Sequence, residues 1–468
     1  MLQRLGARIA EDFKKWMPDA FVFALLLTVI VSIMAMLWTD TSVIQLTEAW
    51  YNGLGGLLKF AMQVVLILVT GFAIALSPIT GKLIDKLAGW VSSPAMVYVF
   101  CITLTCLCTL VTYGLLPVMA VLARELAKRV KGIDYPFLVG CIYISFVPFV
   151  CGLSSSIPLL LNTEGNFLIE AGLLNSTISI ESTLFSPLNI VMTSFYLLGI
   201  PFIMWVMRPK PDQVVEMSTL KSGEEIDEKI TVEEEANSFE MTPRSFSDKL
   251  NGSSILQLIV VAMGIILIVW KFIQVGSDAI NLNMIIFIFL ILGMLLHGTP
   301  MRYVLAMKRA CSNISGIVFQ YPFYAGIMGI MMDTGLGKTI AEWMAGFVTF
   351  ETLPIASFFL GGIVNFAIPS AGGEWAVLGS PLVELAQNLG SGLSPEAYKE
   401  YVAFMAMSVA YGESLTNMVQ PFFLLIVLPV MGAGINIQAR DVMGYVLLPF
   451  IFLFTVSAGL VLFFSFYM

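Results

Sequence analysis

Long apolar runs, separated by short polar or glycine- and proline-rich segments, extend along almost the whole chain. A run of about 20 apolar residues can cross the hydrocarbon core of a bilayer as a helix. The apolar runs lie at approximately 20–38, 58–77, 95–123, 136–161, 183–207, 255–273, 283–296, 314–333, 354–389, 400–430 and 445–467. This pattern predicts an all-α polytopic membrane protein.

Two of these runs, 95–123 and 354–389, are anomalous. The first is long, contains Gly114 and Pro117, and has basic residues on both flanks. Because basic loops stay in the cytoplasm, both ends of this run should lie on that side. We therefore predict that both runs are re-entrant hairpins, each of which enters and leaves the membrane by the same face.

The lysine and arginine residues favour one orientation. With nine crossings, two hairpins and a cytoplasmic N-terminus, the cytoplasmic segments hold twenty of the 24 basic residues. If 95–123 crossed instead, one of its basic flanks would face outward. The first run, 20–38, is too long for the apolar region of a signal peptide and lacks a cleavage site, so we expect it to remain as a membrane helix.

Composition narrows the class further. The chain is 58% hydrophobic and 12% charged, with a mean hydropathy of +0.89, whereas about 25% of the residues in a soluble domain are charged. This difference excludes a water-soluble protein. The cysteines lack the paired spacing of metal ligands, and the only histidine is His297, so a histidine- or cysteine-based metal centre is not expected.

Much of the net charge of −8 is concentrated in one segment. Residues 208–250 contain eleven acidic and six basic residues, a net charge of −5, and few apolar ones. Such a composition is typical of a solvated linker. The predicted division is a first membrane repeat at 1–207, an acidic cytoplasmic linker at 208–254, a connecting helix and loop at 255–282, and a second, inverted repeat at 283–468.

The two halves resemble one another in the order of their segments. GKLIDKLAGWV at 81–91 aligns with GKTIAEWMAGFV at 337–348, and each precedes a hairpin by way of a proline. LVTYGLL at 110–116 then aligns with IVNFAIP at 363–369. Because an odd number of crossings separates the copies, we predict two repeats of inverted topology, as in secondary transporters.

Polar and helix-breaking residues interrupt the apolar runs at four places. These are 111–117, 152–166, 365–375 and 411–421. Non-helical backbone survives at membrane depth only where it lines a cavity or is buried in protein. The breaks could therefore aid helix packing alone, or could form a binding site near the midplane, and we favour a binding site.

The chemistry of the breaks suggests an anion carried together with a cation. No arginine or lysine lies within them, so a bound carboxylate would need peptide dipoles, hydroxyl groups and a cation to neutralise it. We expect no cofactor, with Na⁺ or H⁺ as the coupling ion. Glu374 and Glu413 are candidates to bind it, although each could instead face a water-filled vestibule or cap a half-helix. Tyr113 and Trp375 could pack on a short apolar tail or serve only as packing residues.

Other functional classes find little support. The segment TGLGKT at 334–339 resembles the end of a phosphate-binding loop, but Met332 stands where that motif needs a glycine. There is no G-x-S-x-G nucleophile motif, so an enzyme is not expected. An ion channel remains an alternative, although inverted broken helices are more typical of alternating access.

Four sequence motifs carry a resemblance to a known family. They are KKWMPDAFVFALLLT at 14–28, VFQYPFYAGI at 318–327, NFAIPSAGGEWAVLGSP at 365–381 and AYGESLTNMVQPF at 410–422. With them the chain resembles the bacterial short-chain fatty acid transporters over nearly its full length, apart from the acidic linker. That family is similar in layout to a larger superfamily of cation-coupled, dimeric, elevator-like carriers of organic anions.

The resemblance implies cation-coupled uptake of monocarboxylates such as acetoacetate or butyrate across the bacterial inner membrane by a homodimer in the lipid bilayer, with no nucleic-acid partner. A carrier of dicarboxylates or other small organic anions is the alternative. The family resemblance favours eight residues as site residues: Asn365, Pro369, Ser370, Gly372, Gly373, Gly412, Asn417 and Gln420. Together with the polar residues of the breaks, the candidate substrate- and ion-binding residues are Thr112, Tyr113, Ser154, Ser155, Ser156, Asn365, Pro369, Ser370, Gly372, Gly373, Glu374, Gly412, Glu413, Ser414, Thr416, Asn417 and Gln420. A Na⁺ ion would be expected near Asn365 and Asn417.

Overall fold

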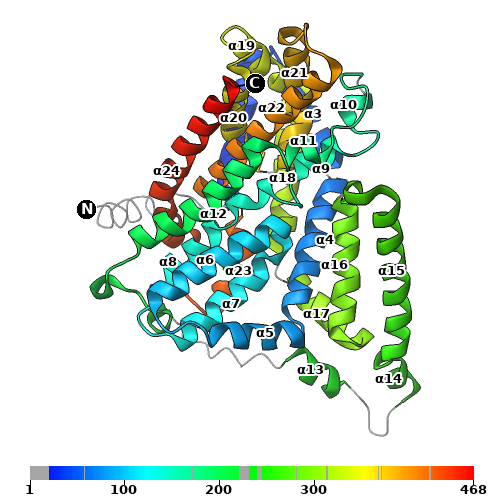
Figure 1. Ribbon diagram of the computed structural model, residues 1–468, viewed down its shortest axis with the longest axis vertical. Coiled ribbons are helices and arrows are strands. Elements are labelled where there is room, and N and C mark those ends of the chain that lie inside the picture. The colour runs from blue at the N-terminus through cyan, green and yellow to red at the C-terminus, as the bar shows by residue number, and fades with distance from the viewer. Residues whose placement is uncertain are drawn as a thin grey trace.

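The protein is built from helices, as the computed structural model shows (Figure 1). The structure describes residues 20–467 except 57, 171, 221–230, 240–244, 281, 313–314, 367, 370 and 421–422. Among these residues there is no β-strand beyond an isolated bridge. The predicted all-α class is confirmed.

The helices follow one another in three groups. The first half holds α2 (Ala20–Trp38), α3 (Val43–Gly56), α4 (Leu58–Ala75), α5 (Pro78–Ala88), α6 (Pro94–Val111), η1 (Tyr113–Leu115), α7 (Leu116–Arg129), α8 (Tyr135–Ile144), η2 (Val147–Cys151), α9 (Ser156–Leu161), α10 (Phe167–Glu170), α11 (Ile180–Thr183) and α12 (Pro187–Met207). The acidic segment holds η3 (Pro211–Gln213), η4 (Met217–Leu220), α13 (Val232–Ser238) and α14 (Phe246–Asn251). The second half holds α15 (Ser254–Val275), η5 (Gly276–Ala279), α16 (Leu282–His297), α17 (Pro300–Ser312), α18 (Ser315–Asp333), α19 (Leu336–Ala345), α20 (Leu353–Val364), α21 (Ala371–Leu389), α22 (Pro395–Thr416), η6 (Asn417–Val419), α23 (Leu424–Met431) and α24 (Ala439–Ser465).

Four of the described helices, α5, α6, α12 and α22, begin with the same dipeptide, Ser-Pro. In α6, α12 and α22 the serine is the N-cap, and its hydroxyl accepts a hydrogen bond from a first-turn N–H at 3.4, 3.3 and 3.2 Å respectively. The proline that follows lacks an N–H, which would have no partner at this position in any case. The local sequence thus fixes where these helices start.

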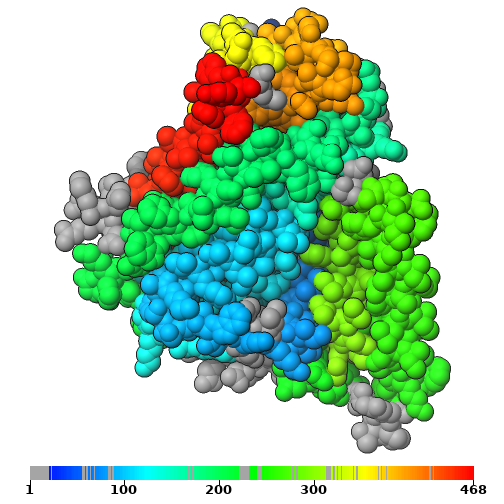
Figure 2. Space-filling model, in the orientation of Figure 1, coloured from blue at the N-terminus to red at the C-terminus, as the bar shows by residue number. Residues whose placement is uncertain are grey.

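Five helical stretches in the described part of the chain are long and apolar enough to cross a membrane. They are Pro94–Val111, Tyr135–Leu161, Pro187–Met207, Phe246–Val275 and Ala439–Ser465. Helices α4, α16 and α15 stand side by side at one edge of the molecule (Figure 1), and α15 exposes apolar side chains around most of its circumference (green at the right in Figure 2). Such a surface suits lipid. The number of crossings stays a prediction.

The run 95–123 is a hairpin, as predicted. The chain becomes extended at Thr112, where φ is −166° and ψ is 138°, and the Thr112 hydroxyl accepts the Gly114 N–H at 3.2 Å. Near the start of α6, the Tyr98 hydroxyl accepts the N–H of Asp134, which lies beyond the end of α7, at 2.7 Å. The two outer ends of the hairpin therefore lie together.

The run 354–389 also folds back on itself, and both of its arms meet the beginning of α22. Tyr401 stacks on Phe350, which lies just before α20, with 4.1 Å between ring centroids, and its hydroxyl donates to the Phe350 carbonyl at 2.6 Å. One turn away, the Tyr398 hydroxyl donates to the Val383 carbonyl of α21 at 3.3 Å. The order of elements is the same in the two halves: an amphipathic helix (α5 or α19), a hairpin, and an interrupted helix (α8–η2–α9 or α22–η6–α23). The inverted orientation of the halves stays a prediction.

Glycines allow the broken segments to approach very closely. Gly71 of α4 lies against the backbone of Gly114 at the tip of the first hairpin, where a Cβ would overlap the Gly114 carbonyl. A Cβ on Gly361 of α20 would lie 2.5 Å from the Val409 carbonyl of α22. Small residues at membrane helix contacts permit such backbone approach.

The acidic segment is more structured than the sequence predicts. Helix α13 begins at a capping box, in which the Thr231 N–H and hydroxyl hydrogen-bond to Glu234 and hold the pKa of this carboxyl below its usual value. Its apolar side, which includes Ala236, packs on Ala73 and on α17. Its acidic side pairs with α17, since Arg302 meets Glu233 at 2.5 Å and the Arg309 Nε donates to Glu235 at 2.8 Å. The net charge of the segment favoured a solvated linker and gave no indication of the amphipathic helix α13.

We expect Gly71→Ala to lower the thermal unfolding temperature of the detergent-solubilised protein by several degrees, because the added methyl group must displace the hairpin tip. Gly459→Ala is the matched control, since a Cβ there meets nothing within 4 Å. A nano-scale fluorimetric melt compares the two variants. Equal unfolding temperatures would contradict the described contact.

Reversing one charge in the α13–α17 contact should release α13. Glu235→Arg faces Arg309 with a like charge, so we expect faster amide hydrogen exchange at residues 232–238, and the double variant with Arg309→Glu should restore protection. Glu342→Arg, in an exposed pair with Lys338, is the control and should leave this exchange unchanged. Protection that persists in Glu235→Arg would show that the Arg309–Glu235 pair is not needed to hold α13.

Candidate functional site

The break between α20 and α21 faces the break between α22 and α23. Asn365 ends α20, and its Nδ2 donates to the Glu413 carbonyl at 3.1 Å, to the Thr416 hydroxyl at 2.8 Å and to Asn417 Oδ1 at 2.9 Å. The backbone approach of α20 to α22 brings these groups within reach. Two sequence motifs some fifty residues apart thus form one site.

Asn417 is the centre of this network. Its Nδ2 donates to Glu413 Oε1 at 2.8 Å, and its Oδ1 also accepts from Gln420 Nε2 at 2.8 Å. Gln420 Nε2 reaches the Asn365 carbonyl as well, at 3.3 Å. We call Asn365, Glu413, Asn417 and Gln420 the amide cluster; each of them is at most 1% exposed.

The first half of the chain holds the amide cluster from the other side. The Tyr143 hydroxyl, at the end of α8, contacts the carbonyls of Asn417 and Gln420, the latter at 2.7 Å. The Ser414 hydroxyl donates to the Val147 carbonyl of η2 at 2.7 Å. The two interrupted helices therefore lie side by side and satisfy each other's freed backbone groups.

The predicted residues of the first hairpin form a second group. Ser154 Oγ accepts the Tyr113 N–H at 3.2 Å, while the Leu153 N–H donates to the Leu110 carbonyl at 2.7 Å. Ser156 is buried at the start of α9, and Ser155 Oγ is buried with no hydrogen-bond partner in the described structure. One backbone hydrogen bond and the Ser154 hydroxyl tie the hairpin tip to the η2–α9 break.

Aromatic rings connect the two groups. The Tyr113 ring lies 6.3 Å from Phe146 and 5.8 Å from Phe149, measured between centroids. Phe146 also packs on Phe423, beside α23, at 4.6 Å. A row of four buried rings thus extends from the first hairpin to the break of the second interrupted helix, just before α23.

The remaining predicted residues have different surroundings. Pro369, Gly372 and Gly373 are buried at the break and at the start of α21, and Ser370 lies outside the described residues. Gly412 contacts the Phe358 carbonyl of α20, where a Cβ would overlap it, so its absent side chain serves helix packing. The hydrogen bonds of Thr112 are those of a turn cap.

Two acidic side chains are fully buried at the site. Glu413 Oε1 is bonded to Asn417, but Glu413 Oε2 and both carboxylate oxygens of Glu374 have no hydrogen-bond partner in the part of the chain that the structure describes. Neither residue forms an ion pair with a described basic residue, and when both are ionised their charges repel. A buried carboxylate without a partner is unfavourable unless it binds a proton or a cation.

The unpaired atoms of the amide cluster are all oxygens. Asn365 Oδ1, Glu413 Oε2 and Gln420 Oε1 lack a donor, whereas the amide nitrogens of Asn365, Asn417 and Gln420 all donate within the site. Buried acceptors are expected to be paired. A group of free oxygens is what a hard cation or a proton would satisfy. The described residues contain no cluster of three or more histidine, cysteine and acidic residues that could hold a metal ion.

Some contributors were not foreseen in the sequence. Tyr143 lies within an apolar run, and its hydroxyl is the one hint of a polar role. Tyr411 donates to Asn189 Oδ1 at 2.9 Å, which braces α22 against α12. Pairings of this kind join residues far apart in sequence, so no local pattern reveals them.

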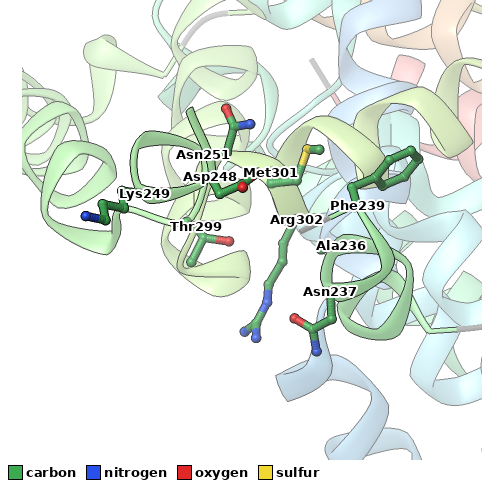
Figure 3. Close-up of a pocket in the computed structure, with 10 residues that line it drawn as sticks. Ala236, Asn237, Phe239, Asp248, Lys249, Asn251, Thr299, Met301 and Arg302 are labelled. Atoms are coloured by element: carbon green, nitrogen blue, oxygen red, sulfur yellow. The ribbon is translucent and has the colours of Figure 1, made fainter. Parts of the chain in front are cut away.

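A cavity of about 210 Å³ lies elsewhere, between α13, α14 and α17 (Figure 3). Asn237 and Arg302 point the same way from its rim, while Lys249 points away from both. Arg302 is already paired with Glu233. None of the predicted site residues lines this cavity, so it is not part of the candidate site.

Comparison with known proteins gives consistent matches along the chain. The family described as "Short chain fatty acid transporter" matches residues 1–466. A protein of Escherichia coli (strain K12) named as a short-chain fatty acid transporter is 37% identical over 459 residues, which cover 97% of each chain. A protein of the same description from Haemophilus influenzae (strain ATCC 51907 / DSM 11121 / KW20 / Rd) is 34% identical, again over 97% of each chain.

The fold is also similar to that of a solved transporter. The crystal structure of the Alcanivorax borkumensis YdaH transporter, reported to have an unusual topology, aligns with a TM-score of 0.51 and 15% identity over 95% of this chain and 98% of that one. The likeness supports the architecture of a multi-pass helical membrane protein. By its full-length family match and its two close relatives, the chain belongs to the short chain fatty acid transporter family, a family of transporters and not of enzymes.

Proposed function

We propose that this transporter carries short-chain monocarboxylates of the acetoacetate or butyrate type, together with a coupling cation, H⁺ or Na⁺. The observation that carries the proposal is the buried set of unpaired oxygens in the amide cluster, with Glu374 beside it and no basic partner among the described residues. Substrate anion and acidic side chains add negative charge in one place. A cation must accompany them through a region of low dielectric constant.

The break at 365–370 and the start of α21 offer the substrate carboxylate a place to bind. Helix α21 is 19 residues long, and its N-terminal N–H groups carry positive partial charge. Gly372 and Gly373 in its first turn have no side chains that would block approach. The rings of Tyr113, Phe146, Phe149 and Phe423 supply an apolar wall for a short tail.

We also propose a cellular location and an oligomeric state for this transporter. A bacterial inner-membrane location with a cytoplasmic N-terminus agrees with the distribution of basic residues along the chain. A homodimer follows from the family resemblance. The relatives from Escherichia coli and Haemophilus influenzae carry the same substrate class in their names.

Uptake of labelled butyrate into proteoliposomes under imposed Na⁺ or H⁺ gradients tests the function. Asn365→Ala and Asn417→Ala should each reduce gradient-driven uptake about tenfold or more, because each leaves buried groups of the network unpaired. Asn283→Ala, an exposed asparagine bonded to Gln63 at 2.8 Å, is the control and should transport normally. Exchange of succinate without butyrate would favour the dicarboxylate alternative, and indifference to both gradients would remove cotransport.

Glu413→Gln should separate coupling from substrate movement. The amide keeps an oxygen for the Asn417 N–H but has no charge for a cation and no site for the proton. We expect gradient-driven accumulation of butyrate to fall to the level seen without a gradient, while exchange of internal for external butyrate persists. Measuring both in the same vesicles gives the comparison, and unchanged accumulation would exclude Glu413 from coupling.

A further inference from the structure

One hydroxyl group faces two backbone carbonyls at the edge of the amide cluster. Tyr143, which is 1% exposed, contacts the carbonyl oxygens of Asn417 and Gln420 at the two ends of η6. A phenol carries a single hydrogen, so it can donate to one carbonyl at a time. The other carbonyl then keeps its lone pairs free of this donor.

The carbonyls of Asn417 and Gln420 add to the unpaired side-chain oxygens of the amide cluster. Gln420 Oε1 belongs to the same residue as one of the two carbonyls, and Asn417 bonds directly to Glu413 and Asn365, whose Oε2 and Oδ1 atoms are unpaired. Backbone carbonyls exposed by a broken helix, amide oxygens and a carboxylate are the ligands that transporters present to Na⁺. Carbonyl and amide oxygens are far too weakly basic to hold a proton at neutral pH.

We propose that both η6 carbonyls, those of Asn417 and Gln420, are ligands for an alkali cation, Na⁺, and that the Tyr143 hydroxyl sets the affinity by competing with the ion for them. The inference rests on the proposed cation-coupled function and deepens it. With the cation bound at both carbonyls, the hydroxyl no longer donates to either of them. Tyr143 is therefore a positioning residue that exchanges its hydrogen bond for the ion.

If the hydroxyl competes with the ion, Tyr143→Phe should raise the affinity for Na⁺. Tyr143→Phe removes the hydrogen bond and leaves both η6 carbonyls without it, which destabilises the cation-free site. A cation that satisfies these oxygens is then bound more tightly. A role confined to holding the fold would have the opposite effect, because a loosened site binds its cation less well.

The experiment measures butyrate uptake into proteoliposomes as a function of external Na⁺ at constant pH, and as a function of pH at constant Na⁺. For Tyr143→Phe we expect the half-saturating Na⁺ concentration to fall about five- to tenfold, the size that one buried unpaired carbonyl implies. The maximal rate should fall as well, since the ion is released more slowly. Tyr196→Phe is the matched control: this tyrosine is similarly buried, and its hydroxyl is hydrogen-bonded to Ser457, at 3.1 Å, away from the η6 carbonyls, so the half-saturating Na⁺ concentration of this variant should not change.

The outcomes test the proposed function and the Na⁺ inference separately. Uptake by the unaltered protein that ignores both gradients overturns the proposed function. Uptake that depends on pH but not on Na⁺ leaves cotransport intact and overturns the inference, as does a half-saturating Na⁺ concentration in Tyr143→Phe that is unchanged or raised.

A second measurement does not depend on the stability of that variant. Fluorotyrosine at position 143 in the otherwise unaltered chain reports the surroundings of the ring by ¹⁹F NMR. We expect Na⁺, and not K⁺ at equal ionic strength, to shift its resonance with the half-saturation seen in transport, while a label at position 196 stays unmoved. A resonance at position 143 that ignores Na⁺ overturns the inference.

Discussion

A backbone amide or carbonyl without a partner is very costly in the interior of a membrane. Every feature of the candidate site follows from this constraint, because the site is made of broken helices. The break at η6 is tolerated since Tyr143 contacts its carbonyls, and the break at η2 is tolerated since Ser414 donates to the Val147 carbonyl. Each half of the chain completes the hydrogen bonding of the other, so neither interrupted helix could form the site alone.

Close backbone packing brings the breaks together. Gly361 and Gly412 let α20 and α22 approach until backbone meets backbone, and this contact brings Asn365 to Asn417. Gly71 does the same for α4 and the first hairpin tip. These glycines thus act as points of contact between backbones. A site built this way is closely packed and has little room to adjust.

One basic residue on the first hairpin bonds to a helix end and not to the amide cluster. Arg124 lies on the first hairpin, but its guanidinium donates to the Val430 and Ala433 carbonyls at 2.8 and 2.7 Å, at the C-terminal end of α23. Its positive charge therefore serves a helix terminus. The amide cluster keeps its acidic residue and its oxygens without a described basic partner. The described part of the site thus lacks the arginine with which many binding proteins hold a carboxylate.

Hydropathy, basic flanks and helix breakers in the sequence were enough to predict a helical membrane protein, two segments that fold back on themselves and the breaks that meet at the candidate site, because these depend on local composition and on the length a bilayer requires. Asn365, Glu413, Asn417 and Gln420 could be named from their motifs. Their mutual bonds could not, since they depend on how α20 meets α22. The contacts of Tyr143 and the packing of α13 on α17 could not be predicted for the same reason. Tyr143 adds one polar atom to an apolar run, and α13 is one amphipathic helix in an acidic segment. Each acquires its contacts only when distant segments pack against it. Local sequence thus determined where the chain breaks, and tertiary packing decided which broken ends satisfy one another.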